Sequence, residues 1–474
     1  MKDTNAGTRS LTEDAAGFAS ALAFDDIPQE TLHIAKRCII DGLGVMLAGT
    51  EQEALAVADR YLAATGAAPA ARPVGNRARR VSPQQAAFWN GLAGHAMDWD
   101  DTQVAEGPDR PYGLLTHPTI PPLSAVLALT EVEAGTSGQD FLTGFVAGVE
   151  VECKIAEAIN PDHYNLGFHT SGTIGTFGSA AASARILGMN AERTAQVLGG
   201  AASMAAGIRA NFGTMGKPMH VGRSSENGVT SALLAREGFT FNHAALDGKW
   251  GYLSVAGRGG EPELVLGRFG APFSLSEPGV SIKPYPCGVL THPSMDAMKA
   301  LMQENGLAPE DIESVTLYAS NNILHPIRFR TAQTELEGKF CMAFLLSAII
   351  LTGRAGKAEF TDAFVQSPEC QAMQQRVETA FDPDIAAMGH DKILSRIEVV
   401  TKSGQTLHKF SDDRYRGGPA NPLSDAEVEG KFLDCVSGIL TDEQARAVLD
   451  TIWSLEDEPD ARVLLDRTNG RALT

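Results

Sequence analysis

SGTIGTFGSAAASARIL, residues 171–187, and AERTAQVLGGAASMAA, residues 191–206, are two helical segments built almost entirely from small side chains. Small residues let helix backbones approach closely, so we expect both segments to be central, buried helices. Gly172, Gly175 and Gly178 superficially resemble a phosphate-binding loop, but the stretch stays helical and follows no strand. Close helix packing is the preferred interpretation, and it predicts an all-helical domain around these segments.

Further helical patterns flank this centre, and a mixed segment interrupts them after about residue 275. The helical patterns cover 28–49, 84–97, 118–133, 138–159, 425–437 and 441–456. The mixed segment alternates as strands over 314–320, 393–401 and 406–410, the last two forming a hairpin, with helices over 294–305, 336–351 and 367–381. We predict a mostly α protein: a large all-helical domain (1–275 and 416–474) and a smaller α+β lid domain (276–415), with a ligand cleft at their joint.

Composition narrows the function classes. The chain has 474 residues and a net charge of −19, which argues against nucleic acid or an anionic membrane surface as partner. The first twenty residues carry acids and no apolar leader, and no apolar run reaches the roughly 18 residues of a membrane span. Six scattered cysteines form no CxxC pair, as expected of free thiols in the cytoplasm.

The stretch HAMDWDDTQ, residues 95–103, gathers one histidine and three acids. The spacing of His95, Asp98 and Asp101 would place all three on one face of a helix. Three hypotheses follow: an active-site wall in which an acid orients a base, a metal site, or a solvated helix end. The active-site wall is preferred because nothing nearby completes a familiar metal-ligand motif.

Two histidines stand at predicted helix entrances. His117 precedes Pro118, and an extended residue before proline leads into a first helical turn. His169 lies directly before the small-residue helix, whose free N–H groups favour an anion. For His117, a capping or packing role is the alternative.

Cations cluster in two further stretches. NFGTMGKPMHVGRSSENG places Lys217, His220 and Arg223 within seven residues at a helix start, which predicts a carboxylate-binding site, with a solvated basic patch as the alternative. SIKPYPCGVLTHP holds Lys283 in a proline-stiffened loop, followed by Cys287 and by His292 at a helix entrance. A packing role for Cys287 is preferred over a nucleophilic one. GxSxG, HExxH and P-loop motifs do not occur in the sequence.

Taken in order, several segments resemble the MmgE/PrpD family: GHAMDWDDTQ, THPTIPPLSAVLAL, GFHTSGTIGTFGSAAASARILGM, NFGTMGKPMHVGRSSENGVTSALLA, IKPYPCGVLTHPSMDAM and, more weakly, TELEGKFCMAFLLSAIILTG. The family includes 2-methylcitrate dehydratase, cis-aconitate decarboxylase and iminodisuccinate epimerase. The resemblance implies a helical domain with an α+β lid, a homodimer, and neither metal nor organic cofactor. In the decarboxylase branch, functional positions correspond to Asp98, Thr102, His117, His169, Lys217 and Lys283.

Two positions depart from the decarboxylase branch. Gly288 stands where that branch has a histidine, and Phe344 stands where it has a tyrosine. Residues 103–115 also look longer than in that branch. These departures argue against cis-aconitate decarboxylation.

The resemblance implies a reaction through a carbanion next to a carboxylate. Such a carbanion is stabilised because its charge spreads onto the carboxylate oxygens. We expect Lys217 and Lys283 to stabilise that charge with help from His169, and His117 to act as general acid/base. Asp98 would orient a base or take the proton itself, Thr102 would position the substrate, and His220 and Arg223 would add to substrate binding. The expected activity is a cofactor-independent lyase of dehydratase type acting on a small polycarboxylate. An epimerase, a decarboxylase and a non-catalytic carboxylate-binding protein remain alternatives.

Overall fold

The small-residue segments form helices at the centre of the large domain. In the computed structural model, which describes residues 10–76, 79–103, 116–389 and 392–468, they are α8 (Thr170–Thr173), α9 (Gly175–Ile186) and α10 (Ala191–Met204). α9 packs against α5 (Ile120–Thr130), α6 (Gly138–Ile159) and α11 (Gly216–Arg236). A Cβ on Gly228 of α11 would lie 2.6 Å from the Ala180 nitrogen of α9, so the backbones themselves are in contact. The prediction of close helix packing is confirmed.

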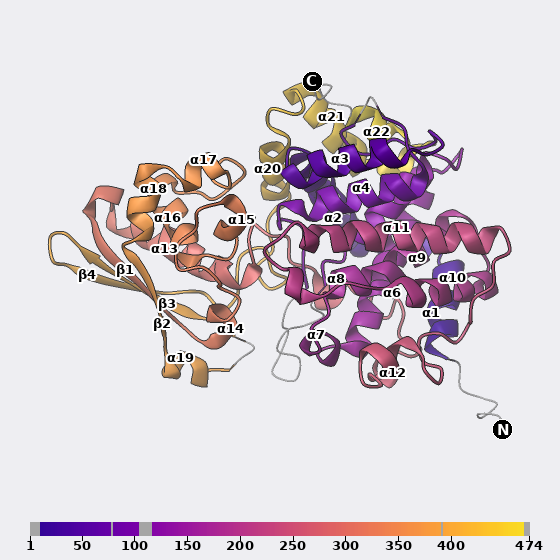
Figure 1. Ribbon diagram of the computed structural model, residues 1–474, viewed down its shortest axis with the longest axis horizontal. Helices are drawn as coiled ribbons and strands as arrows, with labels where there is room; N and C mark the ends of the chain where they lie inside the picture. Colours follow the sequence, from indigo (N-terminus) through magenta and orange to yellow (C-terminus); the bar gives the residue numbers. More distant parts are fainter. Residues whose placement is uncertain (1–9, 77–78, 104–115, 390–391, 469–474) are drawn as a thin grey trace.

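The remaining helices of the large domain surround this centre and include the end of the chain (Figure 1). Ser82 caps α4 with Pro83 at its first position, and Thr441 caps α21, as their sequences predict. α20 packs against α2, which returns the chain from the small domain to the large one. These helices are α1 (Leu11–Ala21), α2 (Gln29–Gly49), α3 (Glu53–Thr65), α4 (Pro83–Ala96), α7 (Asp162–Asn165), α12 (Tyr252–Ala256), α20 (Asp425–Val436), α21 (Asp442–Trp453) and α22 (Val463–Arg467).

The smaller domain is a sheet of order β2-β1-β3-β4 covered by helices. Its strands are β1 (Ile312–Ala319), β2 (Val377–Phe381), β3 (Ser395–Thr401) and β4 (Thr406–Phe410). β1 pairs parallel with β2 and antiparallel with β3, which forms the predicted hairpin with β4. α13 packs on β3 and β4, and α16 packs on β2. The helices are α13 (His292–Asn305), α14 (Asn321–Leu324), α15 (Glu335–Gly338), α16 (Met342–Thr352), α17 (Asp362–Val365), α18 (Pro368–Gln374) and α19 (Pro383–Ala387).

Two helices expected in the small domain are corrected. The segment 367–381 is not one helix: α18 ends at Gln374, and the chain continues as β2, whose backbone pairs with β1 from Val315↔Val377 onward. The segment 336–351 is also broken, because α15 ends at Gly338 and α16 begins at Met342. Tertiary pairing outweighs helical periodicity in the first case.

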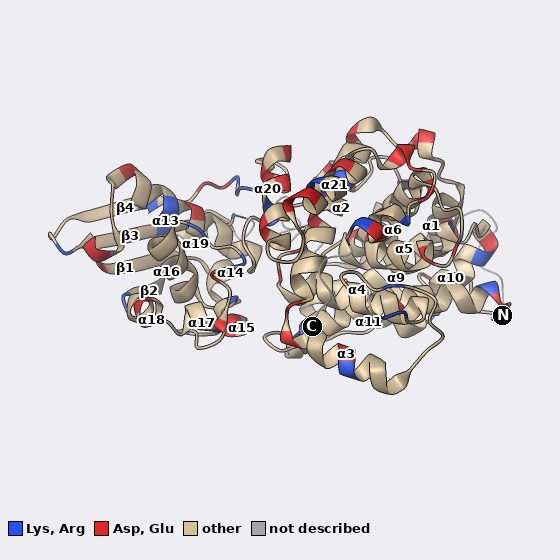
Figure 2. Ribbon diagram, turned by 90° about the horizontal axis from the view of Figure 1, so that it is seen from above, with Lys and Arg blue, Asp and Glu red and all other residues tan. Residues whose placement is uncertain are grey.

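Each domain has its own apolar core. One core cluster runs from Leu11 to Ile282 and resumes at Leu423, and a second runs from Tyr285 to Val399. The exact limits of the predicted domains stay a prediction. Among the described helices, none is both long and apolar enough to cross a membrane. Basic positions are scattered over both domains (Figure 2).

Candidate active site

The stretch HAMDWDDTQ leaves its helix and sends its acids in three directions. α4 ends at Ala96, and Asp98 adopts a left-handed backbone with φ of 55°. The expectation that His95, Asp98 and Asp101 share one helical face is therefore wrong. Asp98 lines a cavity, Asp100 accepts a hydrogen bond from His95 Nδ1 at 2.7 Å, and Asp101 accepts one from the Thr119 hydroxyl at 2.7 Å.

Asp98 is held between two buried lysines. Lys217 Nζ lies 2.7 Å from its Oδ2, and Lys283 Nζ lies 2.7 Å from its Oδ1. Burial alone would raise the pKa of the Asp98 carboxyl, but the two ammonium groups hold it well below its ordinary value. Burial lowers the pKa of Lys217, whereas Asp98 and Asp100 outweigh burial and raise the pKa of Lys283. The two ammonium groups therefore favour the ionised form of Asp98, which makes it a poor proton acceptor.

Three lysines from distant segments fix the backbone of this turn. Lys339 of the small domain donates to the Ala96 carbonyl at 3.1 Å, Lys283 to that of Asp98 at 2.9 Å, and Lys431 of α20 to that of Trp99 at 2.7 Å. Cations at the C-terminus of a helix bind its free carbonyls and complement its dipole. These bonds offset the left-handed backbone of Asp98, which costs about 1–2 kcal/mol in an ordinary residue.

His117 presents a free ring nitrogen to the cavity. Its Nδ1 lies 2.7 Å from the Asp101 carbonyl oxygen and 3.4 Å from the Asp100 carboxylate. Nδ1 must carry the proton because a carbonyl oxygen can only accept, so Nε2 is unprotonated. Burial lowers the pKa of His117 to about 3, against the opposing pull of Asp100. This favours a neutral His117 near pH 7, whose Nε2 is able to accept a proton.

A buried cluster of imidazoles lies behind this wall. His95 and His169 have ring centroids 5.5 Å apart, and His169 Nδ1 lies 3.1 Å from His220 Nδ1. Burial lowers the pKa of His95 and of His169. For Asp100, burial would raise the pKa, but His95 and His117 bring it below its ordinary value. The cluster therefore places one ionised carboxylate beside neutral imidazoles.

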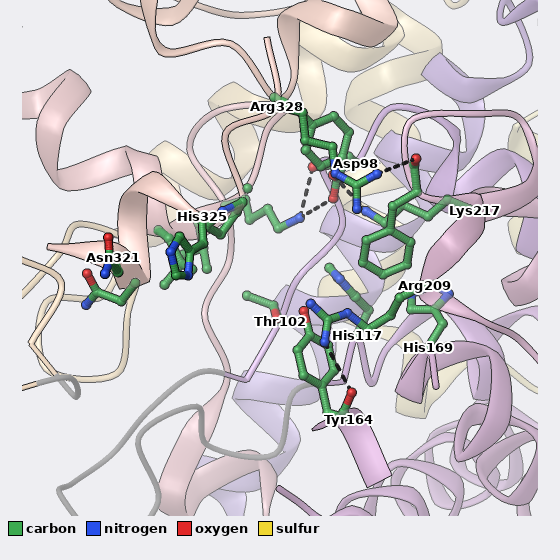
Figure 3. A pocket seen from close by; sticks show the side chains of 18 of the residues that line it. Asp98, Thr102, His117, Tyr164, His169, Arg209, Lys217, Asn321, His325 and Arg328 are labelled. Atoms are coloured by element: carbon green, nitrogen blue, oxygen red, sulfur yellow. Dashed lines mark hydrogen bonds and ion pairs between the residues drawn. The ribbon is translucent and has the colours of Figure 1, made fainter. Parts of the chain in front are cut away.

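These residues meet in a cavity of about 330 Å³ between the domains (Figure 3). Asn321 and His325 approach from the small domain, and Tyr164, Arg209 and His169 from the large one. Among its described lining residues the cavity has one carboxylate, Asp98, against the four cations Arg209, Lys217, Lys283 and Arg328. In a chain of net charge −19, this local concentration of cations is suited to binding an anion.

The structure brings together six of the expected site residues: Asp98, Thr102, His117, His169, Lys217 and Lys283 line the cavity. Thr102 donates its hydroxyl hydrogen to the Thr116 carbonyl at 3.1 Å, so its oxygen remains able to accept. His220 lies one layer back, against His169.

The prediction that Arg223 contributes to substrate binding is wrong. Arg223 is exposed, is bonded to Glu226 one turn along α11, and does not belong to the cavity lining. Proximity in the sequence groups Arg223 with Lys217, yet a six-residue offset on a helix turns its side chain away from that of Lys217.

Sequence reasoning missed several lining residues. Arg209 and Phe212 stand just before Lys217 in the same stretch, so the basic cluster extended upstream could have included Arg209. Tyr164, His325 and Arg328 stand in segments that carried no recognisable signal. The expected longer loop, residues 104–115, lies outside the described residues.

Cys287 belongs to the core rather than to the chemistry. Its Sγ lies 3.3 Å from the Thr291 hydroxyl, and burial raises the pKa of the thiol to about 12. His292 begins α13, as predicted, and its Nε2 lies 3.2 Å from the Cys287 carbonyl. The packing role is the better interpretation of this cysteine.

His95, Asp100 and His117 are the described group whose geometry could hold a metal ion, with ligand atoms within 4.8 Å of one another. The Nδ1 atoms of both histidines already have oxygen partners at 2.7 Å. An ion bound through these Nδ1 atoms would have to replace the hydrogen bonds, whereas His95 Nε2 and Asp100 Oδ1 are buried without a hydrogen-bond partner among the described residues.

Comparisons with known proteins cover nearly the whole chain. The model of the MmgE/PrpD N-terminal domain matches residues 13–265, and that of the MmgE/PrpD C-terminal domain matches residues 285–457. Cis-aconitate decarboxylase of Homo sapiens is 28% identical over 98% of this chain and 95% of its own length. Cis-aconitate decarboxylase of Mus musculus is 28% identical over 96% of this chain and 93% of its own length. That of Aspergillus terreus is 25% identical over 98% of this chain and 97% of its own length.

Proposed function

The chain belongs to the MmgE/PrpD family, and from that premise we propose that it is a lyase. In the proposed reaction, the enzyme forms a carbanion next to a carboxylate of a small di- or tricarboxylate. A β-hydroxyl group of the substrate is then lost as water. The charge of the cavity carries this proposal: four cations face one carboxylate among the described lining residues. A polycarboxylate is the class of small molecule that matches this excess.

Lys217 and Lys283 have donors left for a substrate carboxylate. Each ammonium carries three N–H groups. Lys217 uses one on Asp98 and Lys283 uses two, which leaves three N–H groups without a partner among the described residues. These donors are already in place where negative charge grows during proton abstraction, so they lower the barrier without reorganisation.

His117 takes the α-proton in this proposal. Its unprotonated Nε2 belongs to the cavity wall, and the Asp100 carboxylate 3.4 Å from Nδ1 stabilises the imidazolium that forms. The accepted proton then leaves with the β-hydroxyl as water, which returns His117 to its neutral form. Asp98 orients the two lysines rather than accepting the proton, and Thr102 and His169 position the substrate.

Decarboxylation is the second candidate because the human, mouse and Aspergillus relatives are named cis-aconitate decarboxylases. Gly288 lines the cavity, so the histidine expected of that branch at this position is missing from the wall. Phe344 carries no such weight, because it is fully buried against Phe360 and lies outside the cavity lining. One of the two departures therefore supports dehydration over decarboxylation.

Proton NMR in deuterium oxide with 2-methylcitrate, citrate, cis-aconitate, malate and iminodisuccinate tests the reaction. We expect a new alkene signal from a hydroxy acid. Loss of carbon dioxide would replace the proposal with a decarboxylase, and α-deuterium exchange with inversion would replace it with an epimerase. Complete loss of activity when a chelator is added, together with a stoichiometric amount of metal in the protein by elemental analysis, would overturn the expectation that no cofactor is needed.

A non-catalytic carboxylate-binding protein is the alternative from another class. Such a protein needs the cations but no base. His117→Gln is expected to lower turnover by about 100-fold or more while leaving affinity for an inert carboxylate nearly unchanged. Wild-type binding without any turnover of the panel, equal to that of the variant, would favour the binding protein.

A further inference from the structure

Two of the four cavity cations lack a counter-ion. Lys217 and Lys283 share Asp98, but Arg209 and Arg328 form no ion pair with any carboxylate that the structure describes. The chain has 58 acidic and 39 basic residues, yet one acid, Asp98, is found among the described residues that line this cavity. Both guanidinium groups face a cavity that already suits an anion.

Arg209 is held in a fixed position. Its guanidinium lies 3.8 Å from the centre of the Tyr164 ring, and one terminal nitrogen donates to the Tyr164 carbonyl at 3.2 Å. Its Nε is buried without a hydrogen-bond partner. The contacts with Tyr164 therefore hold the guanidinium in place at the cavity wall.

Arg328 reaches this site from the other domain. It follows α14 in the small domain, and its terminal nitrogen donates to the Phe212 carbonyl of the large domain at 3.2 Å. Phe212 in turn lies against His169, with ring centroids 4.9 Å apart. Arg328 therefore connects the small domain to the wall that carries Arg209 and Lys217 (Figure 3).

We propose that Arg209 and Arg328 together bind a second carboxylate of the substrate, remote from the one held by Lys217 and Lys283. Guanidinium groups bind carboxylates through two parallel hydrogen bonds, which gives both affinity and orientation. The site then selects molecules with at least two carboxylates and holds the small domain against the large one when such a molecule binds. This inference rests on the proposed function for the identity of the first carboxylate.

Calorimetric binding of inert acids tests the proposal without any turnover. The probes are propionate, succinate and tricarballylate, with one, two and three carboxylates. For the wild type we expect succinate and tricarballylate to bind at least about 100-fold more tightly than propionate. Arg209→Gln and Arg328→Gln should each weaken binding of the two larger acids by about 10- to 100-fold and leave propionate unchanged.

Two further variants keep the test sharp. Arg268→Gln removes an exposed arginine that also donates to a backbone carbonyl, that of Leu264 at 2.8 Å, and should change no affinity. Arg209→Lys keeps the positive charge but lacks the planar guanidinium that forms two parallel hydrogen bonds, so it should give an intermediate loss of affinity for the two larger acids. Equal weakening of all three acids, or none, in folded Arg209 and Arg328 variants would overturn the proposal. If this preference holds but no acid of the separate proton NMR panel is turned over, the proposed function fails and this inference stands.

Discussion

At the scale of single residues, the site predicts an unusual pH profile. Proton abstraction needs neutral His117, whose pKa burial lowers to about 3, so kcat/KM should fall only as the pH drops below about 5 rather than near 6.5. It also needs charged Lys217, whose pKa burial lowers, so the alkaline limb should begin below the ordinary lysine value of 10.5. Initial rates after brief exposure to each pH measure both limbs.

A control separates titration from unfolding. Enzyme returned from each pH to pH 7 should regain full activity over the range used. An acid limb centred near 6.5 would contradict the assignment of buried His117 as the base. A profile in which activity rises as the pH falls would contradict the requirement for an unprotonated imidazole.

Several of the residues that line the cavity could be predicted from sequence, but their geometry could not. The gathering of acids, histidines and lysines in short stretches pointed to Asp98, His117, His169, Lys217 and Lys283. The left-handed backbone of Asp98 escaped prediction because it depends on lysines that lie far away in sequence. Arg328 was missed for the same reason, since its role comes only from contact between domains.

At the scale of helices and strands, glycine is required where helices touch. On α11, an added Cβ at Gly228 would lie 2.6 Å from the Ala180 nitrogen. Gly228→Ala must push backbone away from backbone, and we expect it to lower the free energy of unfolding by about 1–3 kcal/mol. Thermal and denaturant unfolding measure the change.

Gly430 on α20 is the matched control. It is exposed, and no atom lies within 4 Å of an added Cβ. Gly430→Ala should therefore raise the free energy of unfolding by about 0.5–1 kcal/mol through helix propensity alone. If both substitutions stabilised the protein, the close packing of α9 and α11 would be refuted.

Elements were predictable where the signal is local. Caps such as Ser82 and the hairpin around Gly404 depend on neighbouring residues, and the structure contains both. β2 was mistaken for helix because its strand state depends on pairing with β1, which lies some sixty residues earlier. The break between α15 and α16 has one local signal, Gly338, which the helical periodicity of the segment outweighed in the prediction, and the break delivers Lys339 to the large domain.

At the scale of the whole molecule, both domains and the C-terminal helices converge on the turn after α4. Lys339 and Lys431 make the same kind of contact there, an ammonium donating to a backbone carbonyl. They differ in charge compensation. Lys431 also lies 2.5 Å from the buried Asp41 carboxylate, whereas Lys339 has no ion pair among the described residues.

The same substitution should therefore act differently at the two positions. Lys431→Met strands Asp41 as a buried, unpaired charge, and we expect a loss of about 3–5 kcal/mol in the free energy of unfolding. Burial lowers the pKa of Lys339, which means that the fold disfavours its charge. Lys339→Met removes that penalty but leaves the buried Ala96 carbonyl without its donor, so its Tm should fall less than that of Lys431→Met.

Catalysis should nevertheless suffer in Lys339→Met. Without the ammonium, the Ala96 carbonyl loses its donor, the turn that carries Asp98 loses a constraint, and small displacements of reacting groups are costly. We expect kcat/KM to fall about tenfold or more while the Tm falls less than in Lys431→Met, with both variants measured side by side. A variant with lowered Tm and unchanged kcat/KM would mean that Lys339 only joins the domains; the opposite result would show that the small domain positions the catalytic turn.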